Sequence, residues 1–215
     1  MRTLINFHRN SNLIKMKTKI ILLILSFFLR TELFSQQNTE LAFSKSYSFE
    51  YETQYSKAIA VLLELNIDTY QINLRLGWLN YLNKDYVKSE TFYKKAVAIE
   101  PASVEARFGL VLPMSALGNW NSVLSVYLDI IKYDPNNSTA NYRIASIYFN
   151  RKEFGNASTY VAKVLRLYPF DYDSNLLLGK ILMAQGKNAE AKKYLGKALE
   201  YNPSSDEVKA EIKKL

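Results

Sequence analysis

Few side chains in this chain could carry out covalent or acid–base chemistry. The 215-residue sequence has one histidine, His8, and no cysteine. Beyond His8 the chain lacks the groups for Ser-His-Asp or Cys-His catalysis and for nearly all zinc sites. The phosphate-binding patterns G-x-x-x-x-G-K-[ST] and G-x-G-x-x-G do not occur. We therefore expect a protein that is not an enzyme, with no catalytic residue, no cofactor and no metal.

The basic charge of the chain is concentrated at its N-terminus. The formal net charge is +8, but residues 1–35 hold six of the 28 basic residues and one of the 20 acidic ones. The remaining 22 basic and 19 acidic residues give a net charge of +3. A surface with both signs interspersed is not a footprint for phosphates, so no nucleic-acid partner is expected.

Residues 1–35 have the pattern of a secretory signal peptide. An uninterrupted apolar run at residues 20–29 follows Lys17 and Lys19 and precedes a polar stretch. Such a run is about 15 Å long as a helix, roughly half a bilayer core, so no stable transmembrane span is expected. Met16 is a possible true start. The alternative of an uncleaved signal anchor stays open.

A regular spacing of prolines indicates a repeat. Prolines stand at 101, 135, 169 and 203, at equal intervals of 34 positions. Each is followed two positions later by a residue that caps helix N-termini, and Thr69 has the same phase one unit earlier. Proline ends one helix and the capping residue begins the next. The capping residues are Ser103, Asn137, Asp171 and Ser205.

Each 34-residue unit contains two helical patterns. In the unit 70–103, Leu74, Trp78 and Tyr81 recur at helical spacing, and a second apolar face follows Lys84-Asp85. A single helical hairpin is too small to bury its faces and is stable only when stacked. The predicted organisation is a signal peptide at 1–35, a degenerate first repeat at 36–69, repeats at 70–103, 104–137, 138–171 and 172–204, and a capping helix at 205–215.

These units resemble the tetratricopeptide repeat family. Leu76-Gly77 and Leu178-Gly179 match its early Leu-Gly pair, and Ala157 and Ala191 match its small position in the second helix. The resemblance covers residues 70–203. It implies an all-α fold, a right-handed α-solenoid of stacked antiparallel helix hairpins.

The unit 104–137 departs from the family pattern. Val111, Val123 and Ile130 stand where small residues are expected, and Pro113 falls inside its first helix. Large residues at these contacts should push the two helices of the hairpin apart, and the proline should kink the first one. We therefore expect an irregular array near residues 104–135.

Family members usually bind a partner peptide or helix in a concave groove lined by the first helix of each unit. Large aromatic residues there can act as rigid anchors, or they can pack into the core. The resemblance also places Arg75 and Arg143 where they could pair with a partner's carboxylates. The predicted groove residues are Gln71, Arg75, Trp78, Tyr81, Glu105, Phe108, Tyr142, Arg143, Phe149, Lys180 and Met183.

We interpret the sequence as a non-catalytic protein-binding scaffold or adaptor. Its composition is similar to that of exported repeat proteins of the Bacteroidetes group, which favours the periplasm or cell envelope of a Gram-negative bacterium. Two alternatives stay open: a structural envelope component that self-associates, or a groove that binds an envelope glycan.

Overall fold

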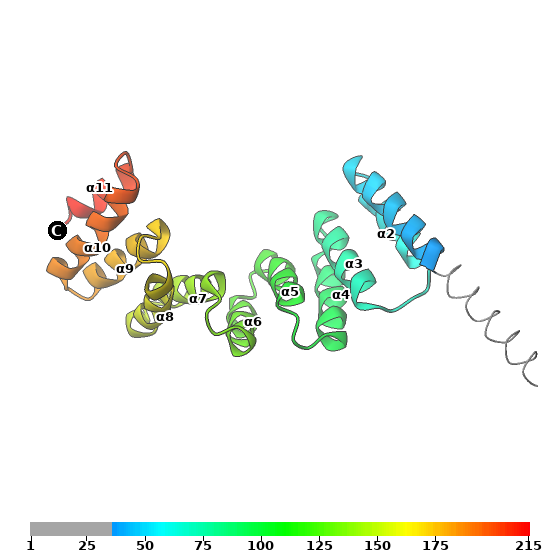
Figure 1. Ribbon diagram of the computed structural model, residues 1–215, viewed down its shortest axis with the longest axis horizontal. Helices are drawn as coiled ribbons and strands as arrows, with labels where there is room; N and C mark the ends of the chain where they lie inside the picture. The colour runs from blue at the N-terminus through cyan, green and yellow to red at the C-terminus, as the bar shows by residue number, and fades with distance from the viewer. Residues whose placement is uncertain (1–35) are drawn as a thin grey trace, which may run out of the picture. The chain divides into compact units, whose positions relative to one another are not determined.

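The computed structural model describes residues 36–215, and every regular element in this range is a helix (Figure 1). The predicted signal peptide lies outside the described residues. The chain divides into two compact units, and the boundary between them follows Ile67. Within residues 36–215, no helix combines the length and the apolar character needed to cross a membrane.

The first unit is a helical hairpin. Residues 36–51 are helical, and α2 runs from Tyr55 to Leu63. Ala42, Ala58 and Leu62 are buried, so the two helices are held together by small and aliphatic side chains.

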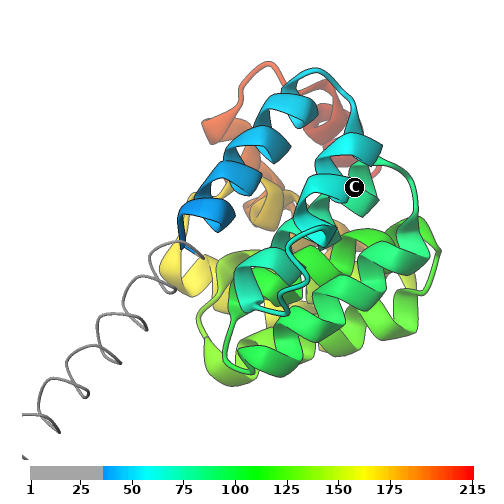
Figure 2. The ribbon, with the colours of Figure 1, turned by 90° about the vertical axis from the view of Figure 1, so that its right-hand side faces the viewer.

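The second unit, Asp68–Leu215, consists of consecutive helices that pack in pairs. Figures 1 and 2 show the pairs α3–α4, α5–α6, α7–α8 and α9–α10, with the short α11 packed on α10. The all-α solenoid of stacked hairpins predicted from the sequence is confirmed. The helices are α3 (Tyr70–Leu82), α4 (Tyr86–Ile99), α5 (Val104–Ala116), α6 (Trp120–Tyr133), α7 (Ser138–Asn150), α8 (Phe154–Leu167), α9 (Tyr172–Ala184), α10 (Asn188–Tyr201) and α11 (Asp206–Ile212).

The predicted capping residues begin the first helix of each hairpin and α11. Each side chain accepts a hydrogen bond from the backbone N–H three residues later, which satisfies an amide that has no partner inside the helix. This confirms the prediction made from the proline spacing. The five caps are Thr69, Ser103, Asn137, Asp171 and Ser205.

The turn inside each hairpin has a left-handed residue at the same phase. Gly118 and Gly186 have φ angles of 74° and 75°, and Lys84 and Lys152 have φ angles of 62° and 61°. These positions coincide with the breaks in helical periodicity seen in the sequence. Glycine adopts this conformation without strain, whereas lysine adopts it at a cost of about 1–2 kcal/mol.

A row of buried asparagines ties the first helices to the turns that precede them. Asn175 Nδ2 donates to the carbonyl oxygens of Pro169 (3.0 Å) and Asp171 (2.8 Å). Asn141 makes the equivalent bonds to Pro135 (3.1 Å) and Asn137 (2.8 Å), 34 residues earlier. The sequence analysis did not identify these residues, although their spacing follows the repeat.

Replacing Asn175 by alanine is expected to destabilise the protein by about 1–3 kcal/mol, because the turn carbonyls lose their donor in a buried place. Urea unfolding followed by circular dichroism measures the change. Asn188→Ala is the matched control, since Asn188 is exposed at the start of α10. Equal stability of the two variants would contradict a structural role for the asparagine row.

Candidate functional site

The predicted groove residues lie on α3, α5, α7 and α9, which are the first helices of the four hairpins. We call the surface that they form the first-helix face. Gln71, Glu105 and Arg143 are exposed, and Trp78 is 36% exposed. The remaining predicted residues except Arg75 are half-buried, namely Tyr81, Phe108, Tyr142, Phe149, Lys180 and Met183.

Aromatic rings gather at the α3 end of this face. Trp78 and Tyr81 are stacked, with 5.9 Å between their ring centroids, and Tyr81 lies 5.7 Å from Tyr86 of α4. Tyr81 and Tyr86 hold the indole of Trp78 in place while part of it remains accessible. A rigid aromatic side chain of this kind loses little conformational entropy when a partner covers it.

Other predicted rings belong partly to the core. Phe108 packs edge-on against the buried Tyr127, with 6.2 Å between the centroids, and Phe149 packs against Phe154 at 5.9 Å. The alternative that these rings pack on neighbouring helices therefore holds for both residues. Phe108 and Phe149 therefore support the first-helix face from the core side.

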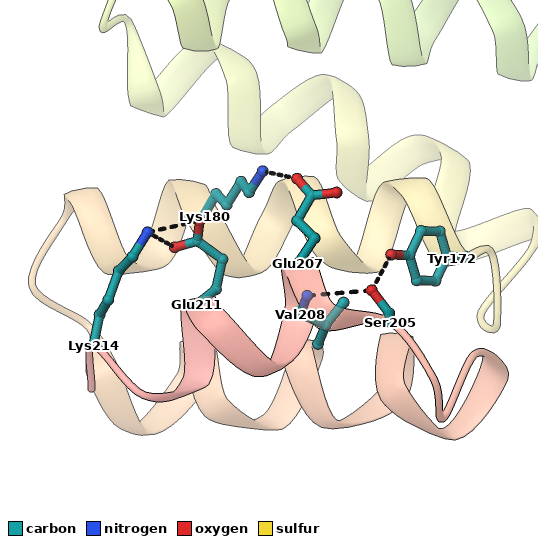
Figure 3. A network of polar contacts seen from close by, with 7 residues as sticks. All are labelled: Tyr172, Lys180, Ser205, Glu207, Val208, Glu211 and Lys214. Atoms are coloured by element: carbon teal, nitrogen blue, oxygen red, sulfur yellow. Dashed lines mark hydrogen bonds and ion pairs between the residues drawn. The ribbon is translucent and has the colours of Figure 1, made fainter.

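Two predicted cations are not available as free charges on this face. Arg75 is buried, with 7% of its surface exposed, which contradicts its prediction as a cation that meets a partner's carboxylate. Its position on α3 faces the packed interior. Lys180 forms an ion pair with Glu207 of α11, as Figure 3 shows. Among the predicted groove cations, Arg143 is the exposed one.

A cleft opens between α5, α6 and α7. Its volume is about 620 Å³, against about 230 Å³ for the adjacent pocket near α9. The lining is mostly apolar and aromatic, with arginines and small polar groups. The residues are Val111, Leu112, Ser115, Trp120, Val123, Tyr127, Arg143, Ser146, Ile147, Asn150 and Arg151.

The cleft coincides with the hairpin that departs from the repeat pattern. Val111 and Val123 line it, and α5 and α6 make fewer close approaches than the helices of the other three hairpins. By contrast, the small residues Ala157 and Ala191 in α8 and α10 are fully buried against their partner helices. The predicted widening of this hairpin is confirmed. The helix α5 continues through the buried Pro113.

The charge of the cleft is positive. Its lining includes Arg143 and Arg151 and no acidic residue. Arg151 Nη2 donates to Asn121 Oδ1 at 2.7 Å, and within residues 36–215 neither arginine forms an ion pair with a carboxylate.

The tyrosines beside Arg143 are neutral phenols. Burial raises the pKa of Tyr127, and nearby Arg143 lowers it to a smaller extent. Burial also raises the pKa of Tyr142, and the negative charge of Asp173 adds to this effect. Since an ordinary tyrosine already has a pKa near 10, both hydroxyl groups stay protonated at physiological pH.

Sequence reasoning named only part of this cleft. It placed Arg143 among the groove residues, but it missed the contributions of Trp120, Tyr127 and Arg151, which come from α6 and the turn after α7. The available signal was the set of bulky residues at positions that are small elsewhere. Large residues at these positions predict a gap between the two helices. The side chains next to such a gap form the lining of the cleft.

The arrangement has the features of a binding surface. Among residues 36–215, no group of histidine, cysteine, aspartate and glutamate side chains is placed to hold a metal ion. What the unit presents is accessible aromatic rings, an apolar cleft and two arginines. The fold and this face define an α-helical repeat protein of the class that serves as protein-interaction scaffolds.

Comparison with known proteins shows what the repeats are similar to. The tetratricopeptide repeat family model matches residues 138–171 and 172–205. The Tetratricopeptide repeat protein 21 homolog of Caenorhabditis elegans is 26% identical over 125 residues, or 58% of this chain. The match spans only 9% of the length of that relative. The hairpins at residues 138–205 therefore match tetratricopeptide repeats.

Solved structures share the fold at low sequence identity. A tetratricopeptide repeat protein from Parabacteroides merdae has a TM-score of 0.72 at 16% identity, over 83% of this chain and 72% of that one. The MamA protein has a TM-score of 0.68 at 19% identity, over 78% and 93%. YrrB, described as a tetratricopeptide protein with an unusual peptide-binding site, has a TM-score of 0.66 at 16% identity, over 81% and 91%.

Proposed function

We propose that this protein is exported to the periplasm or cell envelope of a Gram-negative bacterium and holds a peptide or helix of a partner protein on its first-helix face. The observation that carries the proposal is the accessible aromatic group of α3, in which Tyr81 supports the partly exposed Trp78. A helical array buries its own apolar residues between hairpins. Rings left at the surface of the first helices are therefore available to a partner.

The address in the envelope rests on the sequence of residues 1–35, whose basic start and short apolar run are typical of a signal peptide. The scaffold function rests on the repeat family and on the class of surface that the helices present. Both observations fit one protein that acts outside the cytoplasm by holding another.

Capture from native envelope extract tests the proposed function. Immobilised protein of residues 36–215 is expected to retain a partner that is lost when Trp78 and Tyr81 are both replaced by alanine, since the pair forms one stacked group. Phe170→Ala is the matched control, because Phe170 is a 62% exposed aromatic residue in the turn before α9. Circular dichroism establishes that all three proteins are equally helical.

The same experiment separates the alternatives. Retention of the same proteins by the parent and the double variant would contradict a client site on the first-helix face. Sedimentation velocity at two concentrations tests self-association, and immobilised envelope glycans test a carbohydrate ligand. If the parent retained no partner protein but self-associated or bound a glycan, that alternative would replace the proposed function.

A further inference from the structure

The cleft between α5, α6 and α7 has a more specific chemistry than the rest of the first-helix face. We propose that it binds a large apolar side chain of a partner peptide, together with a carboxylate next to that side chain. This inference rests on the proposed function and specifies the partner: an extended acidic segment with an aromatic or leucine residue between its carboxylates.

The size and lining of the cleft fit an apolar side chain. Its volume of about 620 Å³ lies in the range of pockets that take ordered small ligands. Leu112, Val123 and Ile147 supply aliphatic walls from three different helices, and Trp120 supplies an aromatic edge that is 54% exposed. Water in such an apolar space is readily displaced by an apolar group.

The positive charge of the cleft favours acidic residues next to that side chain in the partner peptide. Arg143 and Arg151 are part of the cleft lining, which contains no acidic residue. A peptide carboxylate at this place gains a charge-assisted hydrogen bond, and a peptide lysine meets repulsion. Asp171 and Asp173 line the smaller adjacent pocket that Arg143 also touches, so the acidic segment is expected to stay on the α5–α6 side of Arg143.

A peptide fits these features better than a nucleic acid. Two cations at the edge of an apolar cleft cannot follow a phosphate backbone, which takes a row of them. The hairpin is also wide because of its own valines, Val111 and Val123. The cleft therefore exists before a partner arrives, and binding does not have to pay for opening it.

Model peptides test the proposed chemistry. The probes are three fluorescein-labelled nonapeptides with a Gly-Ser background: one with Phe between two Glu, one with Ala between two Glu, and one with Phe between two Lys. Fluorescence anisotropy with residues 36–215 is expected to show at least tenfold tighter binding of the first peptide than of the other two. Equal binding of all three would overturn the proposal.

Variants locate the binding. Ser115→Phe fills the cleft with a ring and is expected to reduce binding of the Glu-Phe-Glu peptide at least tenfold, whereas Ser125→Phe, on the exposed side of α6, leaves binding unchanged. Arg143→Gln is expected to weaken binding severalfold, and the control Arg166→Gln, an exposed arginine of α8, is not. Loss of binding with the control variants alone would contradict the cleft.

The two tryptophans provide a second readout that does not depend on affinity. Trp120 lines the cleft and Trp78 does not, so titration with the Glu-Phe-Glu peptide should shift the indole N–H signal of Trp120 in NMR spectra. The Trp78→Phe variant assigns the two signals. A shift confined to Trp78 would overturn the cleft as the binding place.

Failure of this inference is distinguishable from failure of the proposed function. An envelope partner that is lost with the Trp78 and Tyr81 variant but still held by Ser115→Phe would leave the scaffold intact and eliminate the cleft. Binding of the Glu-Phe-Glu peptide at the cleft, with no envelope partner retained, would support the cleft chemistry and contradict the proposed client.

Discussion

Replacing Gly109 by alanine is expected to destabilise the protein by about 2–3 kcal/mol, at the upper end of the usual cost of overpacking a core. A Cβ atom at Gly109 would lie 2.1 Å from Cε1 of Tyr93, and one at Gly77 would lie 2.8 Å from the same ring. The buried ring of Tyr93, on α4, thus lies between glycines of α3 and α5. Thermal unfolding followed by circular dichroism measures the loss.

Gly196 supplies the matched control for this substitution. A Cβ atom there meets no other atom within 4 Å, and Gly196 lies inside α10. Gly196→Ala is therefore expected to stabilise the protein by about 0.5–1 kcal/mol through helix propensity. Tyr93→Leu should recover part of the loss caused by Gly109→Ala, because it removes the ring that the methyl group meets. Equal effects of the two glycine substitutions would contradict the close packing at Tyr93.

The fold was predictable because its determinants are local and recur. The caps Ser103 and Asn137 and the prolines before them mark the helix starts in the sequence. The turn positions follow from the break in apolar periodicity. Lys84 and Lys152 show the limit of this reasoning, because their left-handed conformation is set by the neighbouring helices and not by a residue type that prefers it.

The candidate site was less predictable because it depends on which face of a helix meets a neighbour. Arg75 and Arg143 have the same phase in the repeat, yet Arg75 is buried and Arg143 is exposed and lines the cleft. The environment of a repeat position depends on the side chains of the hairpins before and after it. The family resemblance gives the position of each residue within the repeat. Only the packed structure shows whether neighbouring side chains cover that residue.

The interaction surface and the array's stability are connected through the departures from the repeat. Val111 and Val123 replace the small residues that close the other hairpins, and the cleft lies where they stand. The cleft is thus obtained by giving up close packing in one hairpin. In the hairpins on either side, Ser89 and Ala157 stand at the position of Val123 and are fully buried.

The capping helix α11 protects the apolar end of the second unit. Val208 is fully buried against Leu176, Leu195 and Ala198. Figure 3 shows the polar contacts that fasten α11: Tyr172 meets Ser205 at 2.7 Å, Ser205 accepts from the backbone N–H of Val208, and Lys180 pairs with Glu207. Terminal hairpins of an array need such a cover to remain soluble.

Replacing Val208 by aspartate is expected to detach α11, because a buried carboxylate without a partner costs more than the helix gains by packing. The loss of apolar burial should lower the free energy of unfolding by about 2–3 kcal/mol. Leu176 and Leu195 become accessible, so sedimentation velocity should show stronger concentration-dependent association than the parent shows. Ala210→Asp adds the same charge to the exposed side of α11 and should change neither measurement. If Val208→Asp remained as stable and as monodisperse as Ala210→Asp, the end of the second unit would not depend on α11 for its cover.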